Sequence, residues 1–245
     1  MAKLSVLRNP RMHERFADCR NQGFFRGLSD HLSKAMEEVS SPTSCPERTL
    51  LFVEGEDPRG VYVLTHGQIK LSVDSAQGKT LILKVAEPGE LLGLGACLLN
   101  QPHQVTAEAR MPCKVSLIRR SDFMRLVADS EMCLKVAEHL SRQQQATCRE
   151  MALVALPGSA DLKIASLLLQ ITSSGRGATR NACELGFTHE ELSQVIGTSR
   201  ETVTRSLVRL RRLNIIEIQG ARLTVRNFDE LNRIAQGDAE AAIAQ

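Results

Sequence analysis

The sequence predicts an α+β chain in which a β-rich N-terminal half is followed by one long helix and a helical C-terminal third. Between residues 48 and 120, apolar residues alternate with other residues at strand spacing, and glycine-rich turns separate the runs. From residue 121 onwards the apolar residues recur at helical spacing. We therefore expect an N-terminal arm and β-roll at 1–128, a long helix at 129–156 and a third domain at 157–245.

The composition is that of a soluble globular protein with one large domain or two ordinary ones. The 245 residues are 42% hydrophobic and 24% charged, with a net charge of +3. Because this charge is small, any nucleic-acid affinity must come from local clusters of basic residues. No apolar run approaches the ~20 residues of a membrane span, and the N-terminus lacks the apolar core of a signal peptide. We expect a cytoplasmic chain with no membrane partner.

The seven cysteines are scattered and include no C-x-x-C pair. This pattern favours a reducing compartment and mostly buried thiols. Aromatic residues make up 3% of the chain, which argues against a protein that stacks single-stranded bases. The cysteines are Cys19, Cys45, Cys97, Cys113, Cys133, Cys148 and Cys183.

The first 47 residues are predicted to contain a polar arm and two short helices, one around Phe24 and one around Met36. The polar stretch at 40–47 is interpreted as a loop. Short strands follow, with turns at Gly55, Gly67, Gly78 and Pro88-Gly89, and a last strand at Lys114 to Ile118 closes a sandwich or roll. The alternating apolar residues are Leu51, Val53, Val61, Val63, Ile69, Leu71, Val73, Leu81, Leu83 and Val85.

The long helix carries a heptad seam, with apolar or small residues at alternating steps of four and three. Part of such a seam packs on the β-roll of its own chain, and the rest indicates a dimer interface. Polar residues in mid-seam can set the register of a dimer. The predicted interface consists of Cys133, Ala137, Leu140, Gln144, Thr147, Met151 and Val154.

Residues 187–213 predict two short helices joined by a tight turn. Thr188 and Glu191 have the spacing of a capping box, and Ser199 is a good N-cap for the second helix. Gly197 lies between them, where a sharp turn needs a left-handed residue. Leu192, Val195 and Ile196 mark the inner face of the first helix, and Val203, Leu207 and Leu210 that of the second.

The outward face of the second helix is suited to reading DNA bases. Glu201 and Arg205 are four residues apart and share one face, with Arg200 and Thr204 beside them. An arginine can bind guanine and a carboxylate can accept from cytosine in the major groove. The alternative is an ordinary solvated helix with a Glu–Arg pair. The glycine turn, the caps and the two apolar faces together favour a helix-turn-helix.

The segment SRETVTRSLVRL at residues 199–210 resembles the recognition helix of the CRP/FNR family. This family comprises bacterial transcription factors of the cyclic-AMP receptor and fumarate–nitrate regulator type. FVEGEDPRGVYVLTHGQIKL and EPGELLGLG resemble the family's cyclic-nucleotide-binding β-roll, and IIEIQGARLTV resembles its wing. The resemblance covers about residues 24 to 233. It implies a β-roll sensor, a long dimerisation helix and a C-terminal winged helix-turn-helix.

The resemblance further implies a sequence-specific transcriptional regulator that binds a palindromic operator in double-stranded DNA as a homodimer, under control of an effector or redox signal. Inverted half-sites with a TGA core and RNA polymerase as a partner are expected with it. Arg200, Glu201 and Arg205 should contact bases. The full set of expected DNA contacts is Thr188, Ser199, Arg200, Glu201, Thr202, Thr204, Arg205 and Arg209.

In members of this family that bind cyclic AMP, a Gly-Glu pair opens the phosphate cassette and an Arg-Ser or Arg-Thr pair closes it. Gly89 and Glu90 match the opening pair, but His103 and Gln104 stand near where the closing pair would be. Losing the guanidinium removes a bidentate phosphate contact, so we do not expect cyclic AMP to bind tightly. Thr147 and Cys148 stand where nucleotide binders place a pair against the base, and complete the candidate effector pocket.

The same residues bear on other cofactors and functions. Oxygen-sensing members ligate an iron–sulfur centre with an N-terminal cysteine cluster, which is missing here, so we expect no such cluster. Haem stays open, with His66, His103, Cys97 or Cys148 as ligands. We expect no enzyme. The alternatives are a nucleotide-binding module that acts mainly through protein contacts, and an enzyme on a cupin-like roll, for which the histidine cluster is missing.

Overall fold

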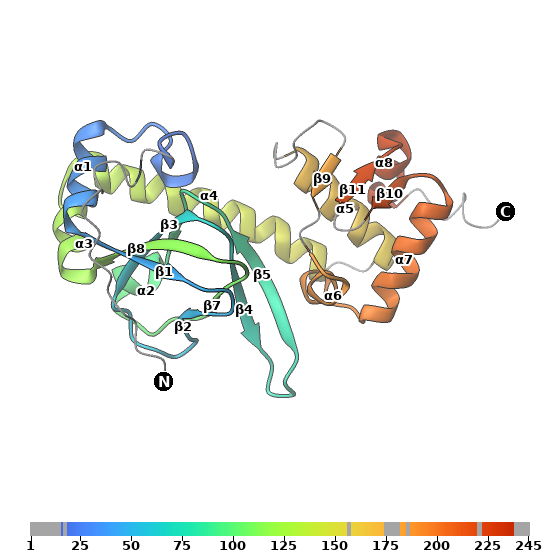
Figure 1. Cartoon of the computed structure of the whole chain (residues 1–245), viewed down its shortest axis with the longest axis horizontal. Coiled ribbons are helices and arrows are strands. Elements are labelled where there is room, and N and C mark those ends of the chain that lie inside the picture. Colours follow the sequence, from blue (N-terminus) through green and yellow to red (C-terminus); the bar gives the residue numbers. More distant parts are fainter. Residues whose placement is uncertain are drawn as a thin grey trace. The chain divides into compact units, whose positions relative to one another are not determined.

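The computed structural model describes Phe16 and residues 19–155, 158–173, 182–184, 187–219 and 222–237. The chain divides into two compact units, Met1–Gln145 and Ala146–Gln245. The first unit holds the strands of the predicted roll, and the second holds the predicted helix-turn-helix (Figure 1).

The first unit contains two four-stranded antiparallel sheets, ordered β1-β8-β3-β6 and β2-β7-β4-β5. Short helices precede and follow the strands, and the long helix α4 begins within this unit. The elements are η2 (Gly23–Phe25), α1 (Asp30–Val39), β1 (Ser40–Cys45), β2 (Leu50–Phe52), β3 (Gly60–His66), β4 (Ile69–Asp74), β5 (Thr80–Ala86), β6 (Leu91–Leu92), α2 (Leu94–Leu99), β7 (Thr106–Ala109), β8 (Cys113–Arg119), α3 (Arg120–Val127) and α4 (Ser130–Ala155).

Strand β3 is buried on both faces, which explains its unbroken apolar run. Val61 and Val63 join a core formed with the helices and the N-terminal phenylalanines. Tyr62 and Leu64 point the opposite way and join a core that draws residues from both sheets. Successive side chains of a strand point to opposite faces, so β3 connects the two cores of the roll.

The prediction of a loop at 40–47 is wrong, because Ser40–Cys45 form β1, which pairs in register with β8. The side chains of β1 are mostly polar, so the sequence pattern did not indicate a strand. Backbone hydrogen bonds to β8 hold the segment in its extended form. Pro42 is compatible with this position because β1 lies at the edge of its sheet, where one side of the strand needs no ladder donor.

Two further differences have local causes. A β-bulge at Leu83 of β5 shifts the pairing of β5 with β4 between Leu71 and Ser72, and Leu83 is exposed although the predicted alternation grouped it with the apolar positions. The helical region after residue 120 is split into α3 and α4, because the Asp129 carboxylate accepts from the backbone N–H groups of Glu131 and Met132 and starts a new helix. Helices α2 and α8 and strands β6, β7 and β9 were not predicted, and β9 begins at Ala182, the last residue of the predicted loop at 173–182.

The second unit is a helical domain with a three-stranded antiparallel sheet ordered β10-β11-β9. The two helices of the predicted turn motif and the two strands after it are confirmed. Of the predicted loop at 173–182, residues 174–181 lie outside the described residues, as does Gly220 of the wing. The elements are α5 (Ala160–Ser173), β9 (Ala182–Glu184), α6 (His189–Ile196), α7 (Arg200–Arg212), β10 (Ile216–Gln219), β11 (Arg222–Val225) and α8 (Phe228–Gln236).

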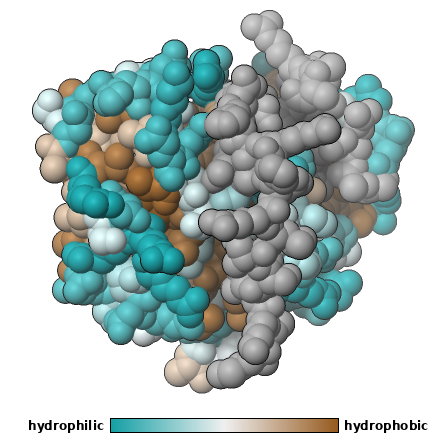
Figure 2. Space-filling model, turned by 60° about the vertical axis from the view of Figure 1, so that its left-hand side comes forward, coloured by the Kyte–Doolittle hydropathy of each residue, from teal (hydrophilic) through white to brown (hydrophobic). Residues whose placement is uncertain are grey.

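Large apolar side chains at the surface come from several separate elements, among them Leu50, Leu99 and Leu134. Figure 2 shows one face of the molecule, where apolar patches lie between hydrophilic side chains. Within the described residues, no helix has the length and apolar character that a bilayer crossing requires.

The turn at Gly89 packs closely against the N-terminal segment, and this predicts a difference between two glycine substitutions. Gly89 and Gly78 both have positive φ, 89° and 74°, so alanine at either position carries left-handed strain of about 1–2 kcal/mol. Only at Gly89 would the new Cβ lie 2.8 Å from the Gln22 carbonyl oxygen, whereas Gly78 faces open space.

We expect Gly89→Ala to cost about 1–3 kcal/mol more than Gly78→Ala, because backbone must move to admit the methyl group. Calorimetric melting of the two variants measures this as a larger fall in the transition of the N-terminal unit. Equal falls would contradict the close packing at Gly89.

Candidate nucleic-acid interface

The turn between α6 and α7 is built as the sequence indicated. The Glu191 N–H donates to the Thr188 hydroxyl (3.1 Å), and the Thr188 N–H donates to the Glu191 carboxylate (2.9 Å), which completes a capping box. Gly197 ends α6 in the left-handed conformation, with φ of 67°. The Thr202 N–H donates to the Ser199 hydroxyl (3.2 Å), which caps α7. These bonds set where each helix begins.

The two faces of α7 differ in character. Val203, Leu207 and Leu210 are buried in the core of the second unit. Glu201 and Arg205 are exposed on the opposite side, as are Arg200, Ser199 and Thr188 near the two helix N-termini. Thr202 and Thr204 are half-buried. The predicted base-reading residues therefore share an accessible face.

The side chains at the start of α7 form a small hydrogen-bonded group. The hydroxyls of Ser199 and Thr202 lie 2.9 Å apart, and an Arg205 nitrogen lies 3.4 Å from the Thr202 hydroxyl. A hydrogen bond from its own backbone N–H, and then one from Ser199, hold the pKa of the Glu201 carboxyl below its usual range. Glu201 is thus an anion at neutral pH and can accept a hydrogen bond from a base.

His189 is a neighbour of this face that the sequence analysis missed. Its Nδ1 lies 3.0 Å from the Thr204 hydroxyl, which itself donates to the Arg200 carbonyl oxygen (3.0 Å). Because the hydroxyl proton points to that carbonyl, Nδ1 is the donor to Thr204. The bond joins α6 to α7 and leaves the Thr204 methyl group as its free part. No local sequence pattern indicates this pair, since fifteen residues separate its members.

Arg209, predicted as a DNA contact, has a partner inside the protein. Its guanidinium forms an ion pair with the carboxylate of Asp161 at the start of α5. The Asp161 side chain is 3% exposed and that of Arg209 is 44% exposed. The sequence analysis did not identify Asp161, which lies among the apolar residues that mark α5.

The wing has a similar ionic tie. Arg226, which follows β11, donates from Nε to the Glu217 carboxylate of β10 (2.8 Å), and a second nitrogen also pairs with that carboxylate. The pair links the two strands across the hairpin and keeps them in register.

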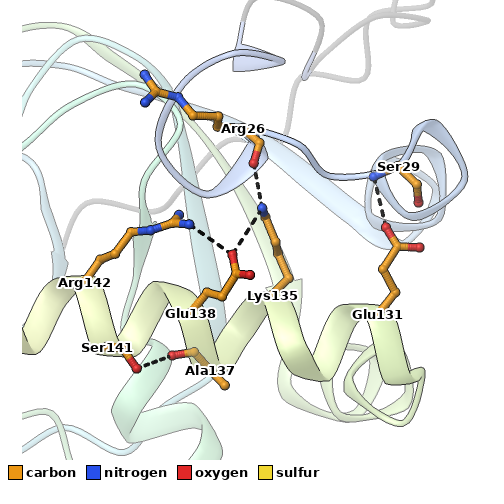
Figure 3. Close-up of polar contacts among 8 residues, drawn as sticks. All are labelled: Arg26, Ser29, Glu131, Lys135, Ala137, Glu138, Ser141 and Arg142. Carbon is orange, nitrogen blue, oxygen red and sulfur yellow. Dashed lines mark hydrogen bonds and ion pairs between the residues drawn. The ribbon is translucent and has the colours of Figure 1, made fainter.

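Helix α4 presents three faces in the first unit. Met132, Val136 and His139 are buried against the roll and the N-terminal phenylalanines. A polar flank carries Glu131, Lys135, Glu138 and Arg142, which pair with one another and with the backbone of Arg26 and Ser29, as Figure 3 shows.

The predicted seam lies on the third face of α4. Cys133, Ala137, Gln144 and Thr147 are exposed, and Leu140 is half-buried at the edge of the roll core. The side chains of Met151 and Val154 lie outside the description. The seam is therefore accessible to a partner at Cys133, Ala137, Gln144 and Thr147.

The predicted effector residues have different environments. Glu90 is paired with Lys84 of β5, and their side chains are 13% and 25% exposed. The Gly89 N–H donates to Leu64 (2.8 Å), and the Gly89 carbonyl accepts from Phe24 (2.8 Å). The carboxylate that a ribose would need already has a cation within the roll.

His103 is a buried residue, 4% exposed, and its ring stacks on Phe52 at a centroid distance of 3.8 Å. Burial lowers its pKa, so the imidazole is neutral at pH 7 and supplies no charge for a phosphate. Gln104 beside it is exposed, as are Thr147 and Cys148 on the part of α4 that belongs to the second unit.

Four of the cysteines with described side chains are buried, and Cys133 and Cys148 are exposed. Burial raises the pKa of the Cys45, Cys97 and Cys113 thiols, which are therefore protonated and unreactive at neutral pH. Within the described ranges, no three histidine, cysteine or acidic side chains gather as metal ligands would.

Comparison with known proteins gives two family matches. Residues 42–130 match the cyclic nucleotide-binding domain, and residues 162–234 match the Crp-like helix-turn-helix domain. The first match begins within β1, the strand at the predicted loop.

Curated relatives match over most of their length. The cAMP-activated global transcriptional regulator CRP of Salmonella typhimurium is 25% identical over 183 residues, 74% of this chain and 87% of the relative. The CRP-like cAMP-activated global transcriptional regulator of Mycobacterium tuberculosis is 23% identical over 218 residues, 87% and 96% of the two chains.

Solved structures share the fold. FixK2 from Bradyrhizobium japonicum superposes with a TM-score of 0.72 at 22% identity, covering 80% of this chain and 97% of FixK2. The c-di-GMP responsive regulator CLP of Xanthomonas campestris gives 0.67 at 20% identity, covering 81% and 100%. With both domains matched in the same order and regulators as its curated relatives, the chain belongs to the CRP/FNR family of DNA-binding transcriptional regulators.

Proposed function

We propose that this regulator binds a palindromic operator in double-stranded DNA as a homodimer, with α7 of each protomer in a major groove. The observation that carries the proposal is the exposed polar face at the start of α7, opposite its buried apolar face. Helix N-termini and the residues around them are the parts of a recognition helix that reach bases and phosphates. The half-sites have a TGA core, as the family resemblance implies.

Arg200, Glu201 and Arg205 read base edges, since they combine forked donors with an ionised acceptor on one face. Thr188, Ser199 and Thr202 contact phosphates at the two helix N-termini. Thr204 has its hydroxyl bonded to Arg200 and His189, so we assign its base contact to the methyl group, which suits a thymine methyl.

The dimer forms through the third face of α4. The roll and the polar flank occupy the other two faces, and the exposed seam repeats with heptad spacing. A two-fold pair of such helices matches a palindromic operator. We accordingly assign residues 1–128 to sensing, 129–156 to dimerisation and 157–245 to DNA binding.

The roll senses a signal other than tightly bound cyclic AMP. The closing arginine of the phosphate cassette is absent, His103 is neutral and stacked, and Lys84 neutralises Glu90. A phosphate in this site would therefore lack its bidentate cation. The curated relatives named above are cAMP-activated, and we propose that this chain differs from them in its response to cyclic AMP. Haem or cysteine chemistry at Cys148 stays a candidate signal.

RNA polymerase is the expected protein partner, and the cytoplasm the expected location, as for a bacterial regulator of this family. The comparisons do not favour the alternative that the chain acts mainly through protein contacts. A regulatory rather than a catalytic role follows from the relatives, which are transcriptional regulators.

The first prediction concerns base reading. Glu201→Ala should relax discrimination at one base pair of each half-site by about 1–3 kcal/mol, because the carboxylate acceptor is lost. In-vitro selection of binding sites measures this. Arg212→Ala is the matched control. Arg212 is exposed at the C-terminal end of α7, where we assign it a phosphate contact, and losing a phosphate contact weakens binding to all sequences alike. Glu201→Ala with an unchanged selected sequence would refute the assignment.

The second prediction concerns the dimer. Glutamate at both Ala137 and Gln144 places like charges across the two-fold axis and should give monomers by sedimentation equilibrium. Operator affinity should fall on the order of 100-fold, because two half-sites are no longer bound as a unit. Arg142→Glu on the polar flank is the control and should stay dimeric. Dimers of the double variant would place the interface elsewhere.

The third prediction concerns the effector. Calorimetric titration with cyclic AMP should show no sub-micromolar binding to the natural chain, and the Salmonella relative serves as the positive control. Replacing His103 by Arg together with Gln104 by Ser should raise any cyclic-nucleotide affinity, since a guanidinium clamp is restored. A sub-micromolar dissociation constant for the natural chain would show that another cation binds the phosphate.

A further inference from the structure

The recognition helix carries an ionic tie on its flank that base reading does not account for. Arg209 pairs with Oδ2 of Asp161, and Oδ1 of Asp161 has no hydrogen-bond partner among the described residues. The Asp161 carboxylate is almost fully buried, at 3% side-chain exposure. Within the described chain, the Arg209 guanidinium is therefore the counter-charge of a buried anion.

A buried carboxylate that loses its cation is strongly unfavourable, whereas a half-exposed arginine loses little by leaving a phosphate. Movement of Arg209 to the DNA backbone would leave Asp161 unpaired in the core of the second unit. The ion pair therefore favours a DNA-bound state in which Arg209 of α7 keeps its contact with Asp161 of α5.

Arg209 lies on the same helix as the predicted base-reading residues Glu201 and Arg205. Glu201, Arg205 and Arg209 follow one another at four-residue steps, and each step turns the stripe by about 40° around the helix. The first two residues face outward, and the third reaches the flank that packs beside α5. The apolar contacts of Val203 and Leu207 with the core resist a large rotation of the helix but, being non-directional, set its angle less tightly than a directed bond would. The ion pair ties one side of α7 to Asp161 of α5, and this directed contact opposes rotation of the helix about its axis.

We propose that Asp161 and Arg209 are positioning residues that fix the rotation of α7 about its axis, and with it the base edges that Glu201 and Arg205 reach. Asp161 is buried and acts through Arg209. The proposal replaces the expected phosphate contact of Arg209, and it rests on the proposed base-reading role of Glu201 and Arg205.

The proposal can be tested by removing either partner of the ion pair and measuring DNA affinity. Arg209→Gln and Asp161→Asn are each compared with the natural chain on the DNA fragment obtained by site selection and on a scrambled fragment of equal length. Positioning predicts that both variants lose affinity for the selected fragment by about tenfold and keep their affinity for the scrambled one. The double variant should lose no more than either single variant, since one pair is broken in all three.

The salt dependence of binding separates positioning from a direct phosphate contact. If Arg209 contacts phosphate, Arg209→Gln lowers the slope of log K against log salt by about one per protomer, and Asp161→Asn raises affinity by freeing the arginine. Either result would overturn the proposal. Arg212→Gln is the control that should lower the slope without changing the ratio between the two fragments.

Circular dichroism melts show whether each variant folds, and Arg209→Lys keeps the counter-charge should the neutral variants unfold. Because lysine lacks the planar fork, it should still lower the ratio of selected to scrambled affinity. An unchanged ratio in a folded Arg209→Lys and Asp161→Asn refutes positioning. If Glu201→Ala also leaves the selected sequence unchanged, the base-reading assignment itself has failed, which is a different result.

Discussion

The DNA-reading surface depends on one packed junction, where the inner face of α7 rests in the core of the second unit with α5 and α6. Val203, Leu207 and Leu210 fill that core, so the helix cannot turn far without exposing apolar surface. Caps at Thr188 and Ser199 set where α6 and α7 begin. A helix whose ends and inner face are fixed presents its outer face without reorganisation when DNA arrives, which reduces the entropic cost of binding.

The roll keeps the family's fold, but the charges around the Gly89-Glu90 turn are paired within the chain. The Gly89-Glu90 turn is retained, but Lys84 supplies the cation for Glu90, and His103 fills space against Phe52. A ligand that uses Glu90 must first displace Lys84, and that exchange costs an ion pair at a half-buried site. The proposed difference from a nucleotide binder thus concerns charge pairing within the roll, while the sheets that hold these residues match the family's fold.

The sequence was informative where local rules decide the structure. The capping box, the glycine turn and the apolar spacing identified α6 and α7 because each acts within a few residues. It failed where order comes from distant partners. Strand β1 looks like a polar loop until β8 pairs with it, and Leu83 is exposed at a bulge of β5 opposite β4. The Arg209–Asp161 and Glu90–Lys84 pairs were also invisible, since sequence spacing does not show which charges meet in space.

Helix α4 is both a wall of the roll and the candidate dimer surface, and this double use has a mechanical consequence. His139 is buried beside Phe24, with its pKa lowered to about 4 by burial and by nearby cations, so it is a neutral packing residue at pH 7. Ala137 and Gln144, on the open face, lie within two turns of it on the same rigid helix. A change of packing in the roll that shifts His139 must shift those seam residues as well. The proposed sensing and dimerisation roles therefore need no separate relay between them, because one helix would serve both.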